Sequence, residues 1–166
     1  MPDTARRGRR PTIAAPARGR SCAAALLITG DGRYLMQHQD DLPSINFPDH
    51  WCCFGGAVEP GETAMAALRR ELHEEIGYEA GGMTLFTEHR VVLPFDVPRR
   101  EAISFFAVPI DPAEALRLRV KEGAGMALLY PAELAIKDKV IPWDLAAVLM
   151  HARRAALFRP AGGPSP

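Results

Sequence analysis

The chain has few cysteines, no excess of charge of either sign and no long hydrophobic run. Its cysteines, Cys22, Cys52 and Cys53, are odd in number and include an adjacent pair, so they do not make a disulfide framework or a spaced zinc-binding quartet. Buried free thiols in a reducing compartment are the simpler interpretation. This interpretation predicts a cytoplasmic protein.

The charges of the chain cancel. Lys and Arg total 20, and Asp and Glu also total 20, so no global field attracts nucleic acid or an anionic membrane. No segment approaches the roughly 20 apolar residues of a transmembrane helix. We therefore expect no nucleic-acid partner and no membrane partner, and any polyanionic ligand must be bound locally by a metal ion or a few side chains.

The N-terminus is basic and rich in proline. Four arginines between positions 6 and 10 precede an apolar run at 22–28, as in an export signal, but that run is too short and a Gly-Asp-Gly turn at 30–32 ends it. We interpret residues 1–18 as a mobile basic arm, with contact to a phosphate-bearing partner as the alternative. The length of the chain then fits a single domain at 19–160 and a tail at 161–166.

Short strand-like segments alternate with two helical ones. The predicted strands are 23–28, 34–36, 83–86, 103–108, and 118–120 together with 126–129. The first helix starts near Thr63, with Glu62 or Thr63 as its cap, and ends at Gly77, because apolar residues recur every fourth position in between. A second helix covers 145–158. Mixed strands and two substantial helices favour an α/β fold in which helices cover both faces of the sheet.

Three acidic residues gather on the polar face of the first helix. Glu71, Glu74 and Glu75 are three and four positions apart, and they lie opposite the apolar stripe. Carboxylates this close repel one another, and a hard divalent cation that takes oxygen ligands removes the repulsion. A solvated acidic surface is the alternative that the helix alone leaves open.

The sequence around these acids resembles the Nudix box, GX5EX7REUXEEXGU, in which U is a bulky aliphatic residue. The matching positions are Gly56, Glu62, Arg70, Glu71, Leu72, Glu74, Glu75 and Gly77. Only the last U departs, as Tyr78, and that position affects packing rather than ligands. The motif requires a glycine loop that runs into a helix, which the residue pattern predicts independently.

The resemblance implies the Nudix fold, an α/β/α sandwich with a mixed β-sheet between helices. It also implies hydrolysis of a phosphoanhydride bond in a nucleoside diphosphate derivative, by a water that bound metal ions acidify. The implied ligands of Mg²⁺, or of Mn²⁺ in its place, are the backbone carbonyl of Gly55 and the carboxylates of Glu71, Glu74 and Glu75. The residues implied to orient these ligands are Arg70, Glu62 and Glu59.

The reaction also needs a general base near the attacking water. Many members of the family use a later acid on a loop, and Glu122 lies in a Lys-Glu-Gly segment similar to the one that carries this acid in MutT-type members. An ordinary surface turn is the alternative interpretation of that segment. Glu71 or Glu74 would then act as the base.

Three features bear on the substrate. MutT-type enzymes place a residue that contacts the purine edge at the start of the last helix, where Asp144 could accept from a guanine-like base and Trp143 could stack on it. The alternatives are a helix cap for Asp144 and a core position for Trp143. Gln39 stands at a substrate-binding position where many relatives carry arginine, so the charged contact to phosphate or sugar is absent. Pro94 matches a proline common in ADP-ribose hydrolases, in a chain with 15 prolines.

These features rank a nucleoside triphosphate, guanine-type and including oxidised forms, ahead of ADP-ribose or a nucleotide sugar. A non-catalytic nucleotide-sensing domain is the remaining alternative. Such domains usually lose glutamates of the box, and this chain has kept them all. Because many relatives dimerise, a homodimer is an expectation drawn from the family alone.

Overall fold

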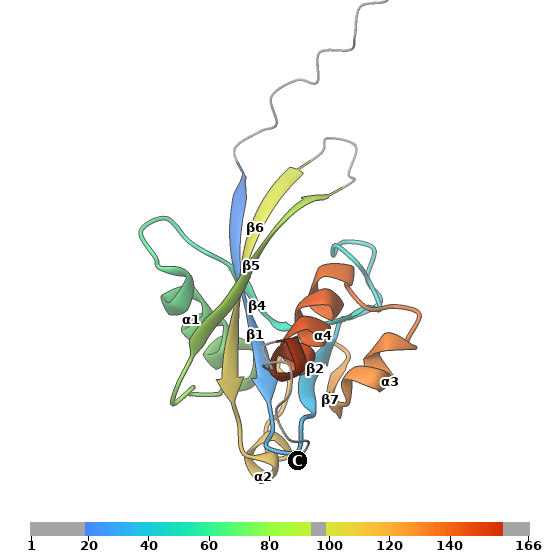
Figure 1. The fold of residues 1–166 in the computed structure, drawn as a ribbon. Coiled ribbons are helices and arrows are strands. Elements are labelled where there is room, and N and C mark those ends of the chain that lie inside the picture. The colour runs from blue at the N-terminus through green and yellow to red at the C-terminus, as the bar shows by residue number, and fades with distance from the viewer. Residues whose placement is uncertain (1–18, 94–98, 158–166) are drawn as a thin grey trace, which may run out of the picture.

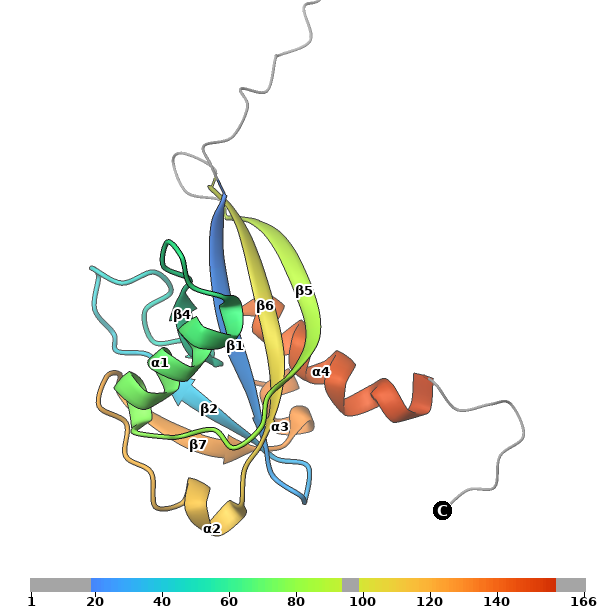
Figure 2. The same cartoon turned by 90° about the vertical axis from the view of Figure 1, so that its left-hand side faces the viewer.

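A computed structural model describes residues 19–93 and 99–157, and within these ranges a mixed β-sheet lies between helices (Figure 1). The strands are β1 (Arg20–Ile28), β2 (Tyr34–His38), β3 (Trp51–Cys52), β4 (Phe54–Ala57), β5 (Thr84–Leu93), β6 (Arg99–Pro109) and β7 (Gly125–Leu129). The helices are α1 (Ala64–Ile76), α2 (Pro112–Ala115), α3 (Pro131–Ala135) and α4 (Pro142–Leu157). Helix α1 covers one face of the sheet and α4 the other, so the predicted α/β/α sandwich is confirmed (Figure 2).

Strand β1 organises the seven-stranded sheet. It pairs in parallel with β6 from Arg20 opposite Glu101 to Ile28 opposite Pro109. Its other edge pairs antiparallel with β4 and, at its end, with β2. Strand β5 extends the sheet beyond β6, while β3 and β7 pair with β2. This register holds the glycine-rich strand β4 against the middle of the sheet, immediately before α1 begins.

The alternation of side chains along β1 divides the core into two layers. Ala23, Ala25 and Leu27 point toward α1 and pack with its buried stripe, which consists of Ala67, Leu68, Leu72 and Ile76. Ala24 and Leu26 point to the other face and pack with residues of α3 and α4. Because α1 turns its apolar stripe to the sheet, its acidic positions lie away from the core.

Helix α1 has the ends that its sequence predicts. Thr63, rather than Glu62, is the cap, and its Oγ1 accepts a hydrogen bond from the backbone N–H of Ala66 at 3.1 Å. Gly77 adopts a left-handed conformation with φ of 66° and donates its N–H to the carbonyl of His73 at 3.0 Å. Both ends of the acid-bearing helix are therefore set by local residues.

The prediction of a strand at 118–120 was wrong. This segment is irregular, and the strand that follows, β7, begins at Gly125. Leu118 and Val120 nevertheless pack against the core on the α1 side, so their apolar character serves packing rather than strand pairing. The short helices α2 and α3 were missed, and each starts with a proline, which is favoured at a first helical position.

Several predictions fall outside the described residues. The basic arm at 1–18, the tail at 161–166 and Pro94 all belong to this group. Within the described residues, no helix is both long enough and apolar enough to span a membrane.

Candidate active site

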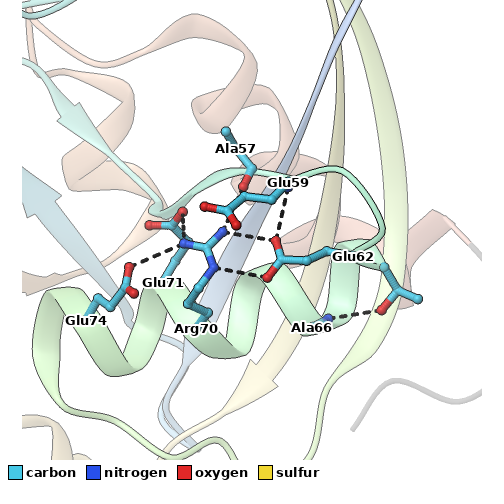
Figure 3. Close-up of polar contacts among 8 residues, drawn as sticks. Ala57, Glu59, Glu62, Ala66, Arg70, Glu71 and Glu74 are labelled. Atoms are coloured by element: carbon cyan, nitrogen blue, oxygen red, sulfur yellow. Dashed lines mark hydrogen bonds and ion pairs between the residues drawn. The ribbon is translucent and has the colours of Figure 1, made fainter.

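Arg70 lies at the centre of the acidic cluster on α1 (Figure 3). Its Nε and Nη2 donate to the two carboxylate oxygens of Glu62 at 3.0 and 3.1 Å. Its Nη1 donates to Glu71 at 2.8 Å and, more weakly, to Glu74 at 3.3 Å. Nη2 also donates to the backbone carbonyl of Ala57 at 3.0 Å, which connects the cluster to the end of β4.

Glu62 acts as the anchor of Arg70. The two hydrogen bonds from Arg70 lower the pKa of the Glu62 carboxyl, and a hydrogen bond from the backbone N–H of Glu59 at 3.0 Å lowers it further. The hydrogen bonds of Arg70 to Glu62 and Glu71 raise the pKa of its guanidinium. Glu59 thus acts through its main chain, because its exposed side chain makes no contact that holds the cluster.

The side chain of Glu75 points toward β4 and not toward Arg70. Its Oε2 accepts a hydrogen bond from the backbone N–H of Gly55 at 3.0 Å. Burial raises the pKa of the Glu75 carboxyl to about 8, and the charges of Glu71 and Glu122 add to the effect, against the lowering by the Gly55 and Gln37 hydrogen bonds. Burial therefore favours the protonated form of the Glu75 carboxyl at neutral pH, and a nearby cation would favour the ionised form.

Both glycines of β4 are required by close approaches. Gly55 has a φ of 141°, and a Cβ at this position would overlap the backbone carbonyl of Ala23 on the neighbouring strand. A Cβ on Gly56 would instead overlap the carboxylate of Glu71. The missing side chain of Gly56 therefore forms a cradle in which the Glu71 carboxylate lies against bare backbone.

The chemistry of these groups fits a hard divalent cation. The cradle presents the carboxylate oxygens of Glu71, and neighbouring carboxylates oppose the ionisation of Glu75. Among the described residues, no three Asp, Glu, His or Cys side chains converge as a complete ligand set, since Arg70 occupies oxygens of Glu71 and Glu74. The assignment of Gly55, Glu71, Glu74 and Glu75 as metal ligands stays a prediction.

A cavity of about 410 Å³ adjoins this cluster. Gly55, Glu75 and Glu122 line it, together with three residues that the sequence predicts to bind substrate, namely Gln39, Trp143 and Asp144. Arg70, Glu71 and Glu74 are not part of its wall. The fold thus brings two predicted ligands, Gly55 and Glu75, and the predicted general base into the same space as the predicted base-binding residues.

Asp144 is buried, with 5% of its surface exposed. Its Oδ2 accepts a hydrogen bond from the backbone N–H of Cys53 at 2.7 Å, and burial raises the pKa of its carboxyl to about 7. Helix α4 begins at Pro142, so Asp144 is its third residue and not its N-cap. The carboxylate therefore connects α4 to the β3–β4 junction at the wall of the cavity.

Trp143 and Gln39 both line the cavity. The partly buried ring of Trp143 packs against the core on the α4 side and makes an edge contact with Phe47, at a centroid distance of 5.3 Å. Trp143 is consequently both a core residue and a wall residue. In the amide orientation that satisfies its polar atoms, Gln39 donates to the carbonyls of Phe47 at 2.8 Å and Asn46 at 3.0 Å, and so holds the loop that carries Phe47.

The sequence analysis missed two polar features of the cavity. Gln37 is buried in β2 and contacts both Glu75 and the backbone of Glu122. Glu101 on β6 is also buried and pairs with Arg99 at 2.8 Å. A polar residue at an inward position of an apolar strand, as in Tyr34-Leu35-Met36-Gln37, was the available indication for Gln37.

A mixed sheet between helices, with a glutamate cluster centred on Arg70 of α1, defines a hydrolase of the Nudix type. The family model described as NUDIX domain matches residues 18–148, and the chain belongs to this family. It is a Nudix hydrolase of the MutT-like kind, as its sequence predicts.

Individual relatives agree with this assignment. The chain is 49% identical over 51 residues to the nucleoside triphosphatase NudI of Escherichia coli, a stretch that covers 31% of this chain and only 36% of that relative. The E. coli ORF135 protein is 27% identical, with a TM-score of 0.63 over 87% of this chain and 95% of its own. The MutT Nudix hydrolase of Burkholderia pseudomallei shares the fold, with 17% identity and a TM-score of 0.66 over 80% of this chain and 98% of its own.

Proposed function

We propose that the protein is a Mg²⁺-dependent pyrophosphohydrolase of nucleoside triphosphates that prefers guanine-type bases, including oxidised ones. One observation carries the proposal: a single cavity joins Glu75 and Glu122 to Trp143 and Asp144. A nucleotide needs a metal-binding subsite for its phosphates and an aromatic, hydrogen-bonding subsite for its base, and residues suited to both line this cavity. The local likeness to a protein called a nucleoside triphosphatase supports the triphosphate.

At the phosphate subsite, the residues of the Nudix box have different roles. Mg²⁺, or Mn²⁺, bound to Glu71, Glu74, Glu75 and the carbonyl of Gly55 would neutralise phosphate oxygens and acidify a water molecule. Arg70 orients Glu71 through its hydrogen bond, while Glu62 keeps the guanidinium of Arg70 in place. Glu122 faces the same cavity as Glu75 and accepts the proton of the attacking water.

At the other end, Asp144 and Trp143 bind the base. Cys53 bonds the carboxylate of Asp144 through its backbone N–H and its thiol, and because a carboxylate has about four lone-pair sites, it can still accept from base N–H groups. Guanine presents adjacent donors on its Watson–Crick edge, whereas adenine presents an acceptor beside its amine and would leave two acceptors facing each other. The ring of Trp143 offers a stacking surface that tolerates every base.

Steady-state kinetics on a nucleotide panel test the proposal. We expect kcat/KM to be highest for guanine-type triphosphates at pH 8, above the pKa of Asp144, and to require Mg²⁺ or Mn²⁺. Asp144→Ala should erase the base preference and spare catalysis, whereas Trp143→Ala should raise KM for every base. A strong preference for ADP-ribose or a nucleotide sugar that Asp144→Ala leaves untouched would reject the proposed substrate. Absence of turnover on the whole panel would favour a nucleotide-sensing role.

The general base is tested separately. Glu122→Gln should lower kcat with little change in metal affinity, because this carboxylate acts on the water and is not a predicted ligand. A variant with wild-type kcat across the pH range would place the base within the box, at Glu71 or Glu74.

A further inference from the structure

Gln37 occupies an unusual place for an amide side chain. It is 6% exposed, and it lies in β2 directly after Tyr34, Leu35 and Met36, all of which are buried in the core. Alternation along the strand points Gln37 to the α1 side of the sheet, the side of Glu75. A buried amide is costly unless its polar atoms have partners, so its partners indicate its role.

Each polar atom of Gln37 has a partner of the matching kind. Nε2 donates to the backbone carbonyl of Glu122 at 2.9 Å and to Oε1 of Glu75 at 3.4 Å. Oε1 accepts from the thiol of Cys52 at 3.5 Å, and burial raises the pKa of that thiol, so it stays protonated and remains a donor. The amide orientation is therefore defined, with its nitrogen toward the predicted catalytic groups.

The loop that carries Glu122 is attached to the same two elements. The backbone N–H of Lys121 donates to the carbonyl of Glu75 at 2.8 Å, at the end of α1. The N–H of Ala124 donates to the carbonyl of His38 at 2.9 Å, in β2. Between these two attachments, Gly123 adopts a φ of 108°, and a Cβ there would press on the same His38 carbonyl.

We infer that Gln37 is a positioning residue, whose single amide nitrogen holds the Glu75 carboxylate and the Glu122 loop in one fixed arrangement. The inference rests on the proposed function, in which Glu75 binds metal and Glu122 accepts a proton. The backbone attachments fix the ends of the loop, and the Gln37 bond fixes the peptide of Glu122 between them. Without the amide, the distance between the Glu75 carboxylate and the peptide of Glu122 is no longer set by a common donor.

Gln37→Met tests the inference because methionine keeps the length of the side chain and removes both donors. We expect kcat to fall by about ten- to a hundredfold, the range typical of residues that orient ligands, with KM nearly unchanged. Mn²⁺ affinity, measured by electron paramagnetic resonance of free Mn²⁺ without nucleotide, should fall as well, since Glu75 loses its support. Should methionine impair folding, Gln37→Leu repeats the test with less volume.

Met36→Leu is the matched control. Met36 is the preceding residue of β2, equally buried, but its side chain packs on the α4 face. This substitution should leave kcat and Mn²⁺ affinity unchanged at a comparable melting temperature. Equal losses in both variants would mean that Gln37 merely stabilises the strand, which would overturn the inference.

A double-mutant cycle with Glu122→Gln tests the coupling. At a Mg²⁺ concentration that saturates both variants, the loss through Glu75 is removed. If Gln37 then acts through the Glu122 loop, the double variant should be little slower than Glu122→Gln alone, whereas independent effects would multiply. Multiplying losses, or Gln37→Met with normal kcat and normal Mn²⁺ affinity, would overturn the inference. The Mn²⁺ measurement needs no substrate, so it decides the role of Gln37 at Glu75 even if the proposed nucleotide specificity fails.

Discussion

Glu75 carries a buried carboxylate whose pKa is raised to about 8 because burial disfavours its charge. Glu75→Gln keeps an acceptor for the N–H of Gly55 and removes the charge that a cation requires. We expect turnover to fall by more than about a hundredfold with the fold intact, and a large loss from Glu74→Gln as well. Kinetics with circular dichroism check this, and Glu79→Gln, an exposed glutamate beside α1, is the control. Near-normal activity in both Glu75→Gln and Glu74→Gln would reject the metal-site assignment.

The raised pKa of Asp144 predicts that the free energy of unfolding depends on pH. An aspartate with a pKa near 3.9 in the unfolded chain and about 7 in the folded protein binds more protons when folded between these values. The free energy of unfolding therefore decreases as pH rises from 4 to 7, by up to about 4 kcal/mol from this residue. Asp144→Asn cannot ionise, so its stability relative to the wild type should increase over this range. Urea denaturation at pH 4, 6 and 8 measures the difference, and a difference that is constant with pH would contradict the assignment.

At the scale of elements, we expect substitution of the two glycines of β4 to have different effects, one on stability and the other on activity. Gly55→Ala brings a Cβ against backbone of β1, which cannot move alone, so we expect a loss of at least about 3 kcal/mol of stability. Gly56→Ala meets only the end of the Glu71 side chain, which can turn away. This variant should fold but lose most activity, because Glu71 leaves its cradle. Thermal unfolding and kinetics distinguish the two, and equal instability would contradict the argument.

The start of α1 depends on Arg70 in a different way. Arg70→Ala removes the hydrogen bonds that connect Glu62, Glu71 and the end of β4. We expect activity to fall by about ten- to a hundredfold, because the carboxylates lose their orientation. Raising the Mg²⁺ concentration should restore only part of the rate, because added metal ions fill the site but do not restore the orientation of the carboxylates. Full recovery at high Mg²⁺ would show that Arg70 affects metal affinity alone.

For the whole molecule, metal binding should be linked to stability. An ion that binds the folded chain and not the unfolded one raises the melting temperature as its concentration exceeds its Kd. We expect Mg²⁺ to raise the melting temperature of the wild type in a saturable way, and to have little effect on Glu75→Gln. Calorimetry with and without a chelator measures this shift. Equal shifts in both proteins would indicate that the ion binds elsewhere.

The sequence alone determined the features that depend on neighbouring residues. The apolar stripe, the Thr63 cap and Gly77 define α1, and the spacing of its glutamates follows from the helix period. The eight matching positions of the box identify the family that the match over residues 18–148 confirmed. Such patterns involve residues that are close in the sequence, so they can be recognised without the tertiary structure.

Only the tertiary structure decided how distant segments share one site. Gln37 gained its role because β2 lies beside the loop of Glu122 and the end of α1, a proximity that no local pattern contains. Asp144 proved to be held by Cys53, 91 positions away, rather than to cap its helix. The segment 118–120 was mistaken for a strand because apolar residues that pack on a core have the same pattern as residues that pair. Burial, strand neighbours and shifted pKa values arise from contacts between remote residues, and these exist only in the folded chain.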